Sequence, residues 1–471
     1  MQYISTRGTA PTLGFEETML AGLARDGGLY VPESWPTLSL DEFRQLRGKS
    51  YAEIAFVIMR PFVAGEIDDA QLRELIEGAY GRFRHRAVCP LVQIGDSEHI
   101  LELFHGPTLA FKDVAMQVLG RLYDLVLERR DDHITIVGAT SGDTGSAAIE
   151  AIRGRQRASI FIMHPHGRTS EVQRRQMTTV HGADAANVHN IAIEGTFDDC
   201  QNLLKAMFND QPFRDEIRLS GVNSINWARI MPQVVYYVTA ALSLGGPDSE
   251  VAFSVPTGNF GDIFAGYIAS QMGLPIRQLI VASNSNDILT RALNLGDHTL
   301  GEVVPTMSPS MDIQISSNFE RLLFDLYDRD APTVASLMHQ LKTDRGFQIE
   351  DARLKPARDL FAAHKADEAT TLAMVKAVYD ETDGYLIDPH TAIGVYAARQ
   401  ELETLKAQGV PVVTLATAHP AKFPDAVEQA TGHRPPLPDH LSDLYEREEK
   451  FTVLPNDLDT VQQHIRRLSV S

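Results

Sequence analysis

The order of apolar and polar positions divides the 471-residue chain into a helical start and a longer part in which strands alternate with helices. In the first part, apolar residues recur with helical spacing, and glycine and proline separate the segments. This spacing predicts helices over residues 16–23, 40–47, 51–62 and 69–79. We therefore expect residues 1–90 to form a mostly helical N-terminal domain.

Beyond residue 90, short apolar runs lead through glycine-bearing loops into helical segments. The runs predict strands at residues 133–138, 158–163, 192–194, 251–255, 279–282 and 410–415, with helices at 144–153 and 263–272. Strands that alternate with helices pair in parallel, and ligands bind beyond their carboxyl ends. Between about 284 and 380 only helical spacing remains. The pattern therefore predicts an α/β fold that carries a helical insertion.

The composition is that of a globular protein, with 44% hydrophobic and 22% charged residues. The 43 Lys and Arg against 62 Asp and Glu give a formal net charge of −19. Because an acidic surface repels phosphate backbones at long range, we expect no nucleic-acid partner. A small anion remains a possible ligand, since a few amides or cations can reverse the field inside a cleft.

Cysteine and histidine usage predicts no metal site. Cys89 and Cys200 are too few for a cysteine zinc site and too isolated for a CxxC redox pair, so we expect two reduced, mostly buried thiols. The histidines show no HExxH spacing. No secretory signal is visible at the N-terminus, and no apolar run has the length of a membrane helix. We therefore expect a cytoplasmic protein with no membrane partner.

Lys112 lies among apolar residues in the segment ELFHGPTLAFKDVAMQ, residues 102–117. Burial lowers the pKa of a lysine and leaves its amine able to attack a carbonyl carbon, which is the chemistry of a Schiff-base lysine. The alternative is a helix lysine whose stem covers apolar neighbours while its charge stays in water. Taken alone, the segment favours this alternative.

Two glycine-bearing loops connect a strand to a helix. GATSGDTG, residues 138–145, offers hydroxyls and free helix-start amides, which suit a carboxylate or a phosphate. The alternative is a helix cap made by Ser141 or Asp143. PTGNFGD, residues 256–262, can direct several amides at an anion, and it matches neither GxxxxGK[ST] nor GxGxxG. It therefore indicates a cofactor phosphate rather than a nucleotide, with a plain tight turn as the alternative.

A fourth segment, NSINWARIMPQ at residues 223–233, places polar side chains within a short helical span. Asn223, Ser224, Asn226 and Arg229 offer two amides, a hydroxyl and a guanidinium, and arginine recognises phosphate or carboxylate through paired hydrogen bonds. Alternatively, Arg229 forms a surface ion pair and the asparagines cap a helix. Considered together, the four segments indicate two anion sites and a reactive lysine.

These segments resemble those of the threonine synthases, which are pyridoxal-phosphate (PLP) enzymes of fold type II in the tryptophan-synthase-β-like family. FHGPTLAFKD, GATSGDTG, NSINWARIMPQ, PTGNFGD and ATAHPAKFP follow in the family's order, and YISTRG at residues 3–8 is similar to the start of the N-terminal domain in its bacterial and fungal branch. The resemblance implies two open, mostly parallel α/β sheet domains besides the helical N-terminal domain. We expect the smaller over residues 91–220, with the lysine, and the larger over 221–471, with the insertion at about 284–380.

For the cofactor, the resemblance implies that Lys112 holds PLP as a Schiff base and later moves protons. It also implies that Thr417, after the last strand, faces the pyridine nitrogen. A loop is expected to bind the PLP phosphate through its amides, and its residues are Gly258, Asn259, Phe260, Gly261 and Asp262.

For the substrate, the resemblance implies one segment that binds a carboxylate and another that binds a phosphate. The expected carboxylate residues are Thr140, Ser141, Gly142, Asp143 and Thr144, and the expected phosphate residues are Asn223, Ser224 and Arg229. Related enzymes often have asparagine at the position of Asp143. This departure disfavours a bond from Asp143 to the phenolic oxygen of PLP, because two anions would repel.

The reaction that the resemblance implies converts O-phospho-L-homoserine and water into L-threonine and phosphate. Lys112 or the released phosphate would remove the Cβ proton, and the sequence leaves both open. A monomer is favoured, and a dimer is possible. The other functions considered are a serine or threonine dehydratase or β-replacing lyase, which would not need Arg229, and a catalytically silent PLP-binding protein, which would lack Lys112 or the phosphate loop.

Overall fold

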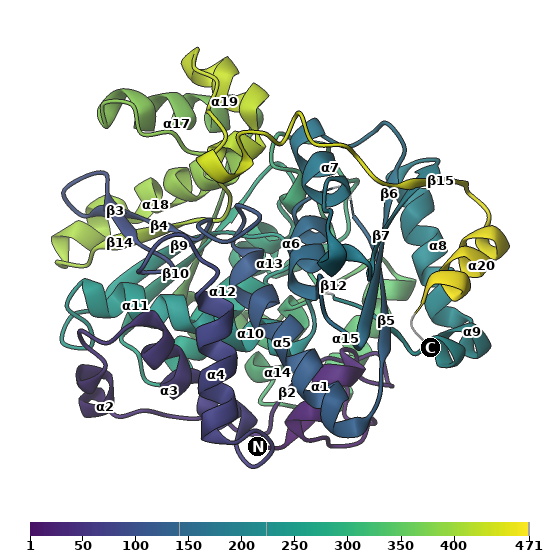
Figure 1. Ribbon diagram of the computed structural model, residues 1–471. Coiled ribbons are helices and arrows are strands. Elements are labelled where there is room, and N and C mark those ends of the chain that lie inside the picture. The colour runs from purple at the N-terminus through teal and green to yellow at the C-terminus, as the bar shows by residue number, and fades with distance from the viewer. Residues whose placement is uncertain (141, 223, 470–471) are drawn as a thin grey trace. The chain divides into compact units, whose positions relative to one another are not determined.

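The computed structural model describes residues 1–140, 142–222 and 224–469, and it consists of two compact units (Figure 1). Unit 1 comprises Met1–Met19, Leu23–His105 and Ser224–Pro435. Unit 2 comprises Leu20–Gly22, Gly106–Asn223 and Pro436–Ser471. These ranges differ from the expected domains, because residues 91–105 belong to unit 1 and residues 436–471 belong to unit 2.

The N-terminal part of unit 1 combines helices with a small β-ribbon. The helices begin and end within two residues of the predicted limits: α1 (Phe15–Ala21), α2 (Leu40–Gln45), α3 (Tyr51–Val63) and α4 (Asp69–Tyr80). Capping boxes at Ser39 and Ser50 explain the starts of α2 and α3. The two strands that the sequence did not predict, β1 (Tyr3–Ser5) and β2 (Tyr30–Pro32), pair antiparallel.

The main sheet of unit 1 has the strand order β13-β10-β9-β14-β4-β3 within the described residues, and it is parallel except for the β3–β4 pair. Its strands are β3 (Leu91–Gln93), β4 (Glu98–Glu102), β9 (Val251–Pro256), β10 (Ile276–Ser283), β13 (Phe361–Lys365) and β14 (Val412–Ala416). Since β14 pairs in parallel with both β9 and β4, the carboxyl ends of these three strands lie at one edge.

The stretch from 284 to 380 is not purely helical, which corrects the prediction for it. Its residues Phe361–Lys365 form β13 at the edge of the main sheet, and β11 (Asp297–Thr299) pairs antiparallel with β12 (Gly346–Gln348). These strands are short and only partly apolar, so helical spacing dominates the segment. Its helices are α13 (Ile288–Leu295), α14 (Phe319–Leu326), α15 (Ala331–Thr343), α16 (Asp351–Leu360) and most of α17 (Glu368–Glu381).

The remaining helices of unit 1 flank its strands. They are α10 (Trp227–Ile230), α11 (Val234–Ser243), α12 (Gly261–Gln271), α18 (Pro389–Ala407) and α19 (Pro424–Thr431). α18 packs on β9, β10 and β14, and its buried Ile393 and Ala397 form a core with Ala252 and Val412. Within the described ranges, no helix of the chain combines the length and the apolar character needed to cross a membrane.

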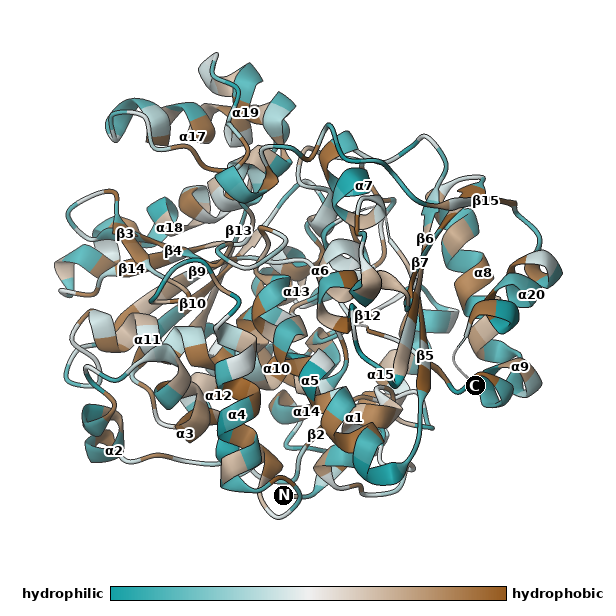
Figure 2. Ribbon diagram, in the orientation of Figure 1, coloured by the Kyte–Doolittle hydropathy of each residue, from teal (hydrophilic) through white to brown (hydrophobic). Residues whose placement is uncertain are grey.

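Unit 2 is built on a parallel sheet with the order β15-β7-β6-β5-β8. The strands are β5 (Ile134–Ala139), β6 (Ala158–Pro165), β7 (Val188–Glu194), β8 (Leu219–Ser220) and β15 (Thr452–Pro455). The central strands are strongly apolar (Figure 2). The C-terminal segment joins this unit because β15 pairs with β7 and α20 (Leu458–Leu468) buries Val461 and Ile465 in the core.

The helices of unit 2 cover both faces of its sheet (Figure 1). α8 (Phe197–Asn209), α9 (Gln211–Glu216) and α20 form one core with β5, β6 and β7. α5 (Lys112–Arg130), α6 (Asp143–Ile152) and α7 (Glu171–Thr178) form the other group. α5 and α6 approach closely at Gly120, where an added Cβ would lie 2.2 Å from the carbonyl oxygen of Ala151. This contact fixes the spacing of the two helices.

Replacement of Gly120 by alanine should destabilise the fold, because a backbone atom of α6 must move to admit the methyl group. We expect Gly120→Ala to lower the free energy of unfolding by about 1–3 kcal/mol, measured by urea unfolding with circular dichroism. Gly301→Ala is the control, since its Cβ would meet Gln314 at the ordinary distance of 3.5 Å. Equal stability of the two variants would contradict the close approach.

Candidate active site

Lys112 is the first residue of α5, and its side chain is only 12% exposed. Its Nζ lies 3.7 Å from Oδ2 of Asp143, whose side chain is 4% exposed. The structure therefore does not show a lysine that extends its charge into water. It places a nearly buried amine beside one carboxylate, at the start of two neighbouring helices.

The loop before Lys112 is held by Asp113, a residue that the sequence analysis did not single out. The Asp113 carboxylate accepts hydrogen bonds from the N–H of Thr108 at 2.7 Å and from its Oγ1 at 2.9 Å. Leu109, between them, has φ +63°, and an added Cβ on Gly106 would lie 2.5 Å from Asp113. The loop therefore has little freedom, and Lys112 begins α5 at a defined place.

The predicted carboxylate loop connects β5 to α6. Oγ1 of Thr140 accepts the N–H of Gly142 at 3.1 Å, and Gln173 donates to Oδ1 of Asp143 at 3.2 Å. Gly142 is the N-cap of α6, which has no side-chain cap, and Thr144 in its first turn is half-buried. Ser141 lies outside the described residues. The amides at this helix start suit a carboxylate, while Asp143 is engaged with Lys112 and Gln173.

The predicted phosphate loop connects β9 to α12. Phe260 precedes the helix with φ +63°, and its ring packs 5.2 Å from that of Phe319. Among the described residues, no protein acceptor bonds to the N–H groups of Gly258, Asn259, Phe260 and Gly261. An added Cβ on Gly258 would lie 2.6 Å from the carbonyl oxygen of Ser310. These residues fit a small dianion such as a cofactor phosphate, because main-chain donors at a helix start can surround it.

Asp262 is buried within unit 1, directly after the loop. Its Oδ1 accepts hydrogen bonds from the hydroxyls of Tyr236 and Tyr237, and among the described residues no donor reaches its Oδ2. Burial raises the pKa of Asp262 to about 7, although the two tyrosine hydrogen bonds act in the opposite direction. Its carboxyl group thus connects the start of α12 to α11 through the two tyrosines.

Thr417 follows β14 at the same sheet edge as the phosphate loop, because β14 and β9 pair in parallel. Thr417 is buried. The neighbouring strand β4 ends at Glu102, which is polar. Glu102 accepts hydrogen bonds from Tyr385 at 2.6 Å and pairs with His105 at 2.7 Å. Burial alone would raise the pKa of Glu102, but these two partners lower it. Burial lowers the pKa of His419 to about 4, so its ring is neutral beside Thr417 at neutral pH.

The last predicted segment surrounds α10. Asn226 caps this helix by accepting the N–H of Ala228 at 3.0 Å, and it also donates to the carbonyl oxygen of Met19 at 2.8 Å. Arg229 is only 3% exposed, which excludes a surface ion pair. α10 packs on α12, and an added Cβ on Gly261 would lie 3.2 Å from Cδ1 of Ile230. Asn223 lies outside the described residues, and Ser224 begins the described part of this segment.

The predicted residues thus form two groups. Unit 2 contains Lys112, Thr140, Gly142, Asp143 and Thr144. Unit 1 contains the phosphate loop, Thr417, Ser224 and Arg229.

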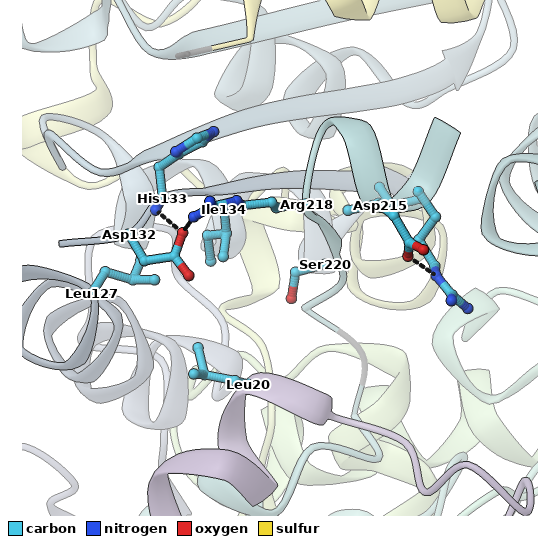
Figure 3. A pocket seen from close by; sticks show the side chains of 10 residues that line it. Leu20, Leu127, Asp132, His133, Ile134, Asp215, Arg218 and Ser220 are labelled. Atoms are coloured by element: carbon cyan, nitrogen blue, oxygen red, sulfur yellow. Dashed lines mark hydrogen bonds and ion pairs between the residues drawn. The ribbon is translucent and has the colours of Figure 1, made fainter. Parts of the chain in front are cut away.

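Unit 2 also has a pocket at the amino end of β5, lined by His133, Ile134 and Arg218 among others (Figure 3). Ligands in parallel sheets bind at the opposite, carboxyl ends, so this pocket is not the candidate site.

Comparisons with known proteins cover almost the whole chain. The family model "Threonine synthase N terminus" matches residues 2–80, "Pyridoxal-phosphate dependent enzyme" matches 100–339, and "Threonine synthase, C-terminal" matches 391–465. A threonine synthase of Pseudomonas aeruginosa is 58% identical over 99% of this chain and 98% of its own length.

Solved structures agree. The crystal structure of a PLP-bound threonine synthase from Brucella melitensis matches with a TM-score of 0.96 and 58% identity, and it covers both chains completely. A yeast threonine synthase matches with a TM-score of 0.94 and 41% identity over 99% of this chain and 98% of its own. The predicted fold type II architecture and the PLP cofactor are thereby confirmed. The chain belongs to the threonine synthase family of PLP-dependent lyases.

Proposed function

We propose that the chain converts O-phospho-L-homoserine and water into L-threonine and phosphate, with PLP bound at Lys112. The observation that carries the proposal is the packing of two anion-binding segments in unit 1. α10, with Arg229, lies against the start of α12, which follows the phosphate loop. One phosphate site serves the cofactor. A second site beside it suits a substrate that carries its own phosphate.

PLP, when bound, supplies an electron sink that stabilises negative charge at the substrate Cα. In the proposal, Nζ of Lys112 would hold the cofactor aldehyde until the substrate amine takes its place. The freed amine of Lys112 would then take the proton from Cα and return it. Asp143, 3.7 Å from Nζ, holds the amine in place. Asp113 positions the same residue through the loop that it closes. Thr417 would lie opposite the pyridine nitrogen of the cofactor.

The substrate is bound at both of its charged ends in the proposal. The amides at the start of α6, with Thr140, Ser141, Gly142 and Thr144, bind the carboxylate. Arg229 and the residues Asn223 and Ser224 bind the phosphate and stabilise its charge as it leaves. Such preorganised donors contribute most where negative charge develops.

We further propose that the main-chain N–H groups of Gly258, Asn259, Phe260 and Gly261 hold the cofactor phosphate. A carboxylate directly after this loop would oppose a dianion. The raised pKa of Asp262, about 7, lets the carboxyl group stay largely neutral below that pH.

We also propose that the protein acts in the cytoplasm as a monomer. Both cysteines are buried and free, which suits a reducing compartment.

The raised pKa of Asp262 has a measurable consequence for stability. Folding holds its proton up to about pH 7, whereas the unfolded chain releases it near the ordinary value. The wild type should therefore lose stability relative to Asp262→Asn as pH rises from about 4 to about 7, and the difference should then level off. Urea unfolding followed by the fluorescence of Trp35 and Trp227, both in unit 1, would measure this. Asp359→Asn serves as the control, because Asp359 is exposed. If the free energies of unfolding of the wild type and Asp262→Asn changed equally with pH, the raised pKa of Asp262 would be wrong.

The proposed reaction is tested by comparing substrates with and without a phosphate. The wild-type holoenzyme should release phosphate from O-phospho-L-homoserine with equal formation of L-threonine, and it should act far more slowly on L-serine and L-threonine. Arg229→Met should reduce kcat/KM for the phosphorylated substrate by about 100-fold to 1,000-fold. Arg229→Lys should restore part of the loss, and the slow reaction with L-serine should change little.

Two results would contradict the proposal. A wild-type preference for unphosphorylated serine would indicate the dehydratase function instead. Equal losses on both kinds of substrate in Arg229→Met would show that Arg229 does not act on the phosphate. Arg277→Met is the control for removal of a guanidinium, because Arg277 contacts only Gln408 at the surface in the described hydrogen bonds.

A further inference from the structure

Asn318, the residue before α14, contacts both anion-binding segments of unit 1. Its main-chain N–H donates to the carbonyl oxygen of Asn259 at 3.1 Å. Its Nδ2 donates to the same oxygen at 3.0 Å and to the carbonyl oxygen of Ser224 at 3.3 Å. Asn318 is completely buried. One amide thus joins the loop proposed for the cofactor phosphate to the segment proposed for the substrate phosphate.

Arg321, one turn later, fixes the orientation of that amide. It is also completely buried, and its Nη1 donates to Oδ1 of Asn318. A guanidinium can only donate, so Oδ1 must face Arg321 and Nδ2 must face the two carbonyls. The same guanidinium donates to the carbonyl oxygens of Tyr30 at 3.0 Å and Ile225 at 2.6 Å.

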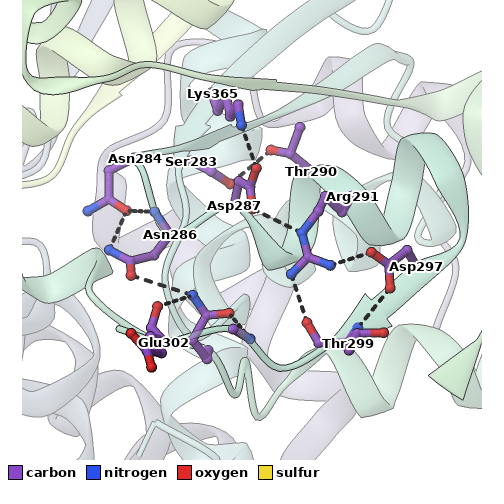
Figure 4. A network of polar contacts seen from close by, with 12 residues as sticks. Ser283, Asn284, Asn286, Asp287, Thr290, Arg291, Asp297, Thr299, Glu302 and Lys365 are labelled. Carbon is purple, nitrogen blue, oxygen red and sulfur yellow. Dashed lines mark hydrogen bonds and ion pairs between the residues drawn. The ribbon is translucent and has the colours of Figure 1, made fainter. Parts of the chain in front are cut away.

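The start of α14 is itself anchored. Glu320 accepts hydrogen bonds from Thr6 at 2.6 Å and from Nη2 of Arg7 at 2.9 Å, so the YISTRG motif holds this helix. The preceding segment is tied to residues after β10, where Asn286 donates to the carbonyl oxygen of Val304 at 2.8 Å and Asn284 donates to Ser308. Nδ2 of Asn286 also donates to Oδ1 of Asn284 at 3.1 Å (Figure 4). The start of α14, which carries Asn318 and Arg321, is therefore held in place on both sides.

These contacts determine where the donors of the phosphate loop point. Oγ of Ser316 donates to the carbonyl oxygen of Gly258 at 2.7 Å, and Asn318 holds that of Asn259. In a planar trans peptide, the C=O and the following N–H point in opposite directions. Holding the two carbonyls on the α14 side therefore directs the N–H groups of Asn259 and Phe260 to the other side.

The same geometry applies to the second segment. Asn318 and Arg321 hold the carbonyls of Ser224 and Ile225, so the N–H groups of Ile225 and Asn226 point away from α14. Neither Asn318 nor Arg321 needs to touch a ligand to influence anion binding. Each acts through main-chain units that it orients.

We propose that Asn318 and Arg321 are positioning residues that direct the main-chain donors of the cofactor-phosphate loop and couple this loop to the substrate-phosphate segment. The inference rests on the proposed function of residues 258–261. The N-terminal YISTRG motif contributes indirectly. It holds Glu320, and Glu320 lies on the same helix start as Asn318 and Arg321.

The test compares the binding of PLP with that of pyridoxal, which has the same aldehyde but no phosphate. Both ligands are titrated spectroscopically into the apoprotein, so the readout does not depend on turnover. In Asn318→Ala, the Kd of PLP should rise about 10-fold to 100-fold, as expected for misdirected buried donors. The Kd of pyridoxal should stay within about threefold, since pyridoxal does not use the loop. Because alanine adds no negative charge, electrostatic repulsion of the PLP phosphate cannot explain a weaker affinity.

Two further variants, Ser316→Ala and Asn187→Ala, complete the comparison. Ser316→Ala removes one donor to Gly258 and should weaken PLP alone, by about three- to tenfold; it decides the question if Asn318→Ala does not fold. Asn187→Ala is the matched control, because its Nδ2 donates to the carbonyl oxygens of Ile152, Arg155 and Ala158 in unit 2. It should leave both affinities unchanged.

The outcomes separate this inference from the proposed function. If the wild type binds PLP no more tightly than pyridoxal, the phosphate loop itself is wrongly assigned. If the wild type discriminates and Asn318→Ala and Ser316→Ala discriminate equally well, the positioning role is wrong. Equal losses for PLP and pyridoxal in these variants would indicate a merely structural role and would also overturn it.

Discussion

A lysine at the first position of a helix faces the positive end of the helix dipole, and burial removes the water that would stabilise its charge. Lys112 is in this situation at the start of α5, with the carboxylate of Asp143 nearby. The dipole and the burial oppose a positive charge, while Asp143 supports it. This is the amine that, in the proposed function, holds the cofactor aldehyde. The Asp113 contacts and the close approach at Gly120 keep it in that position.

The anion sites use a different physical principle. The chain has a formal net charge of −19, yet the loop at residues 258–261 contains no cationic side chain. In the proposed function, main-chain N–H groups at a helix start provide the positive potential instead. Their direction depends on the carbonyls of the same peptide units, which Ser316 and Asn318 hold. The segment proposed for the substrate phosphate contains a buried arginine, Arg229, on the helix α10 that packs on α12.

In both units the proposed ligand-binding residues follow the carboxyl ends of parallel strands, as expected for open α/β sheets. β5 leads to the carboxylate loop, β9 leads to the phosphate loop, and β14 leads to Thr417. The strongly apolar strands and the periodic helices were predicted from the sequence, because their spacing is set by local burial. β13 was missed, since it is a short, partly exposed edge strand. The C-terminal β15 was missed as well, because only its pairing with β7 makes it a strand.

Sequence reasoning located the segments of the candidate site but not their supports. Glycine-bearing loops and a lysine among apolar residues are local signals that single out Lys112 and residues 258–261, but only the resemblance to the threonine synthases assigns roles to them. Asn318 contacts Ser224, 94 positions earlier, so no local pattern reveals its role. Asp113 was within reach, because its partner Thr108 is only five positions away in the same motif. The sequence also left open whether Arg229 is buried or exposed. It is buried because of how α10 packs, which no local pattern reveals.

The identity of the lysine that binds the cofactor underlies the whole proposed function. Lys422, five positions after Thr417, is a second candidate, because it is buried. Borohydride reduction of the holoprotein fixes the cofactor to its amine, and peptide mapping by mass spectrometry then locates it. The account predicts that the reduced adduct is found on the peptide that contains Lys112. An adduct on Lys422, or none on any lysine, would contradict it.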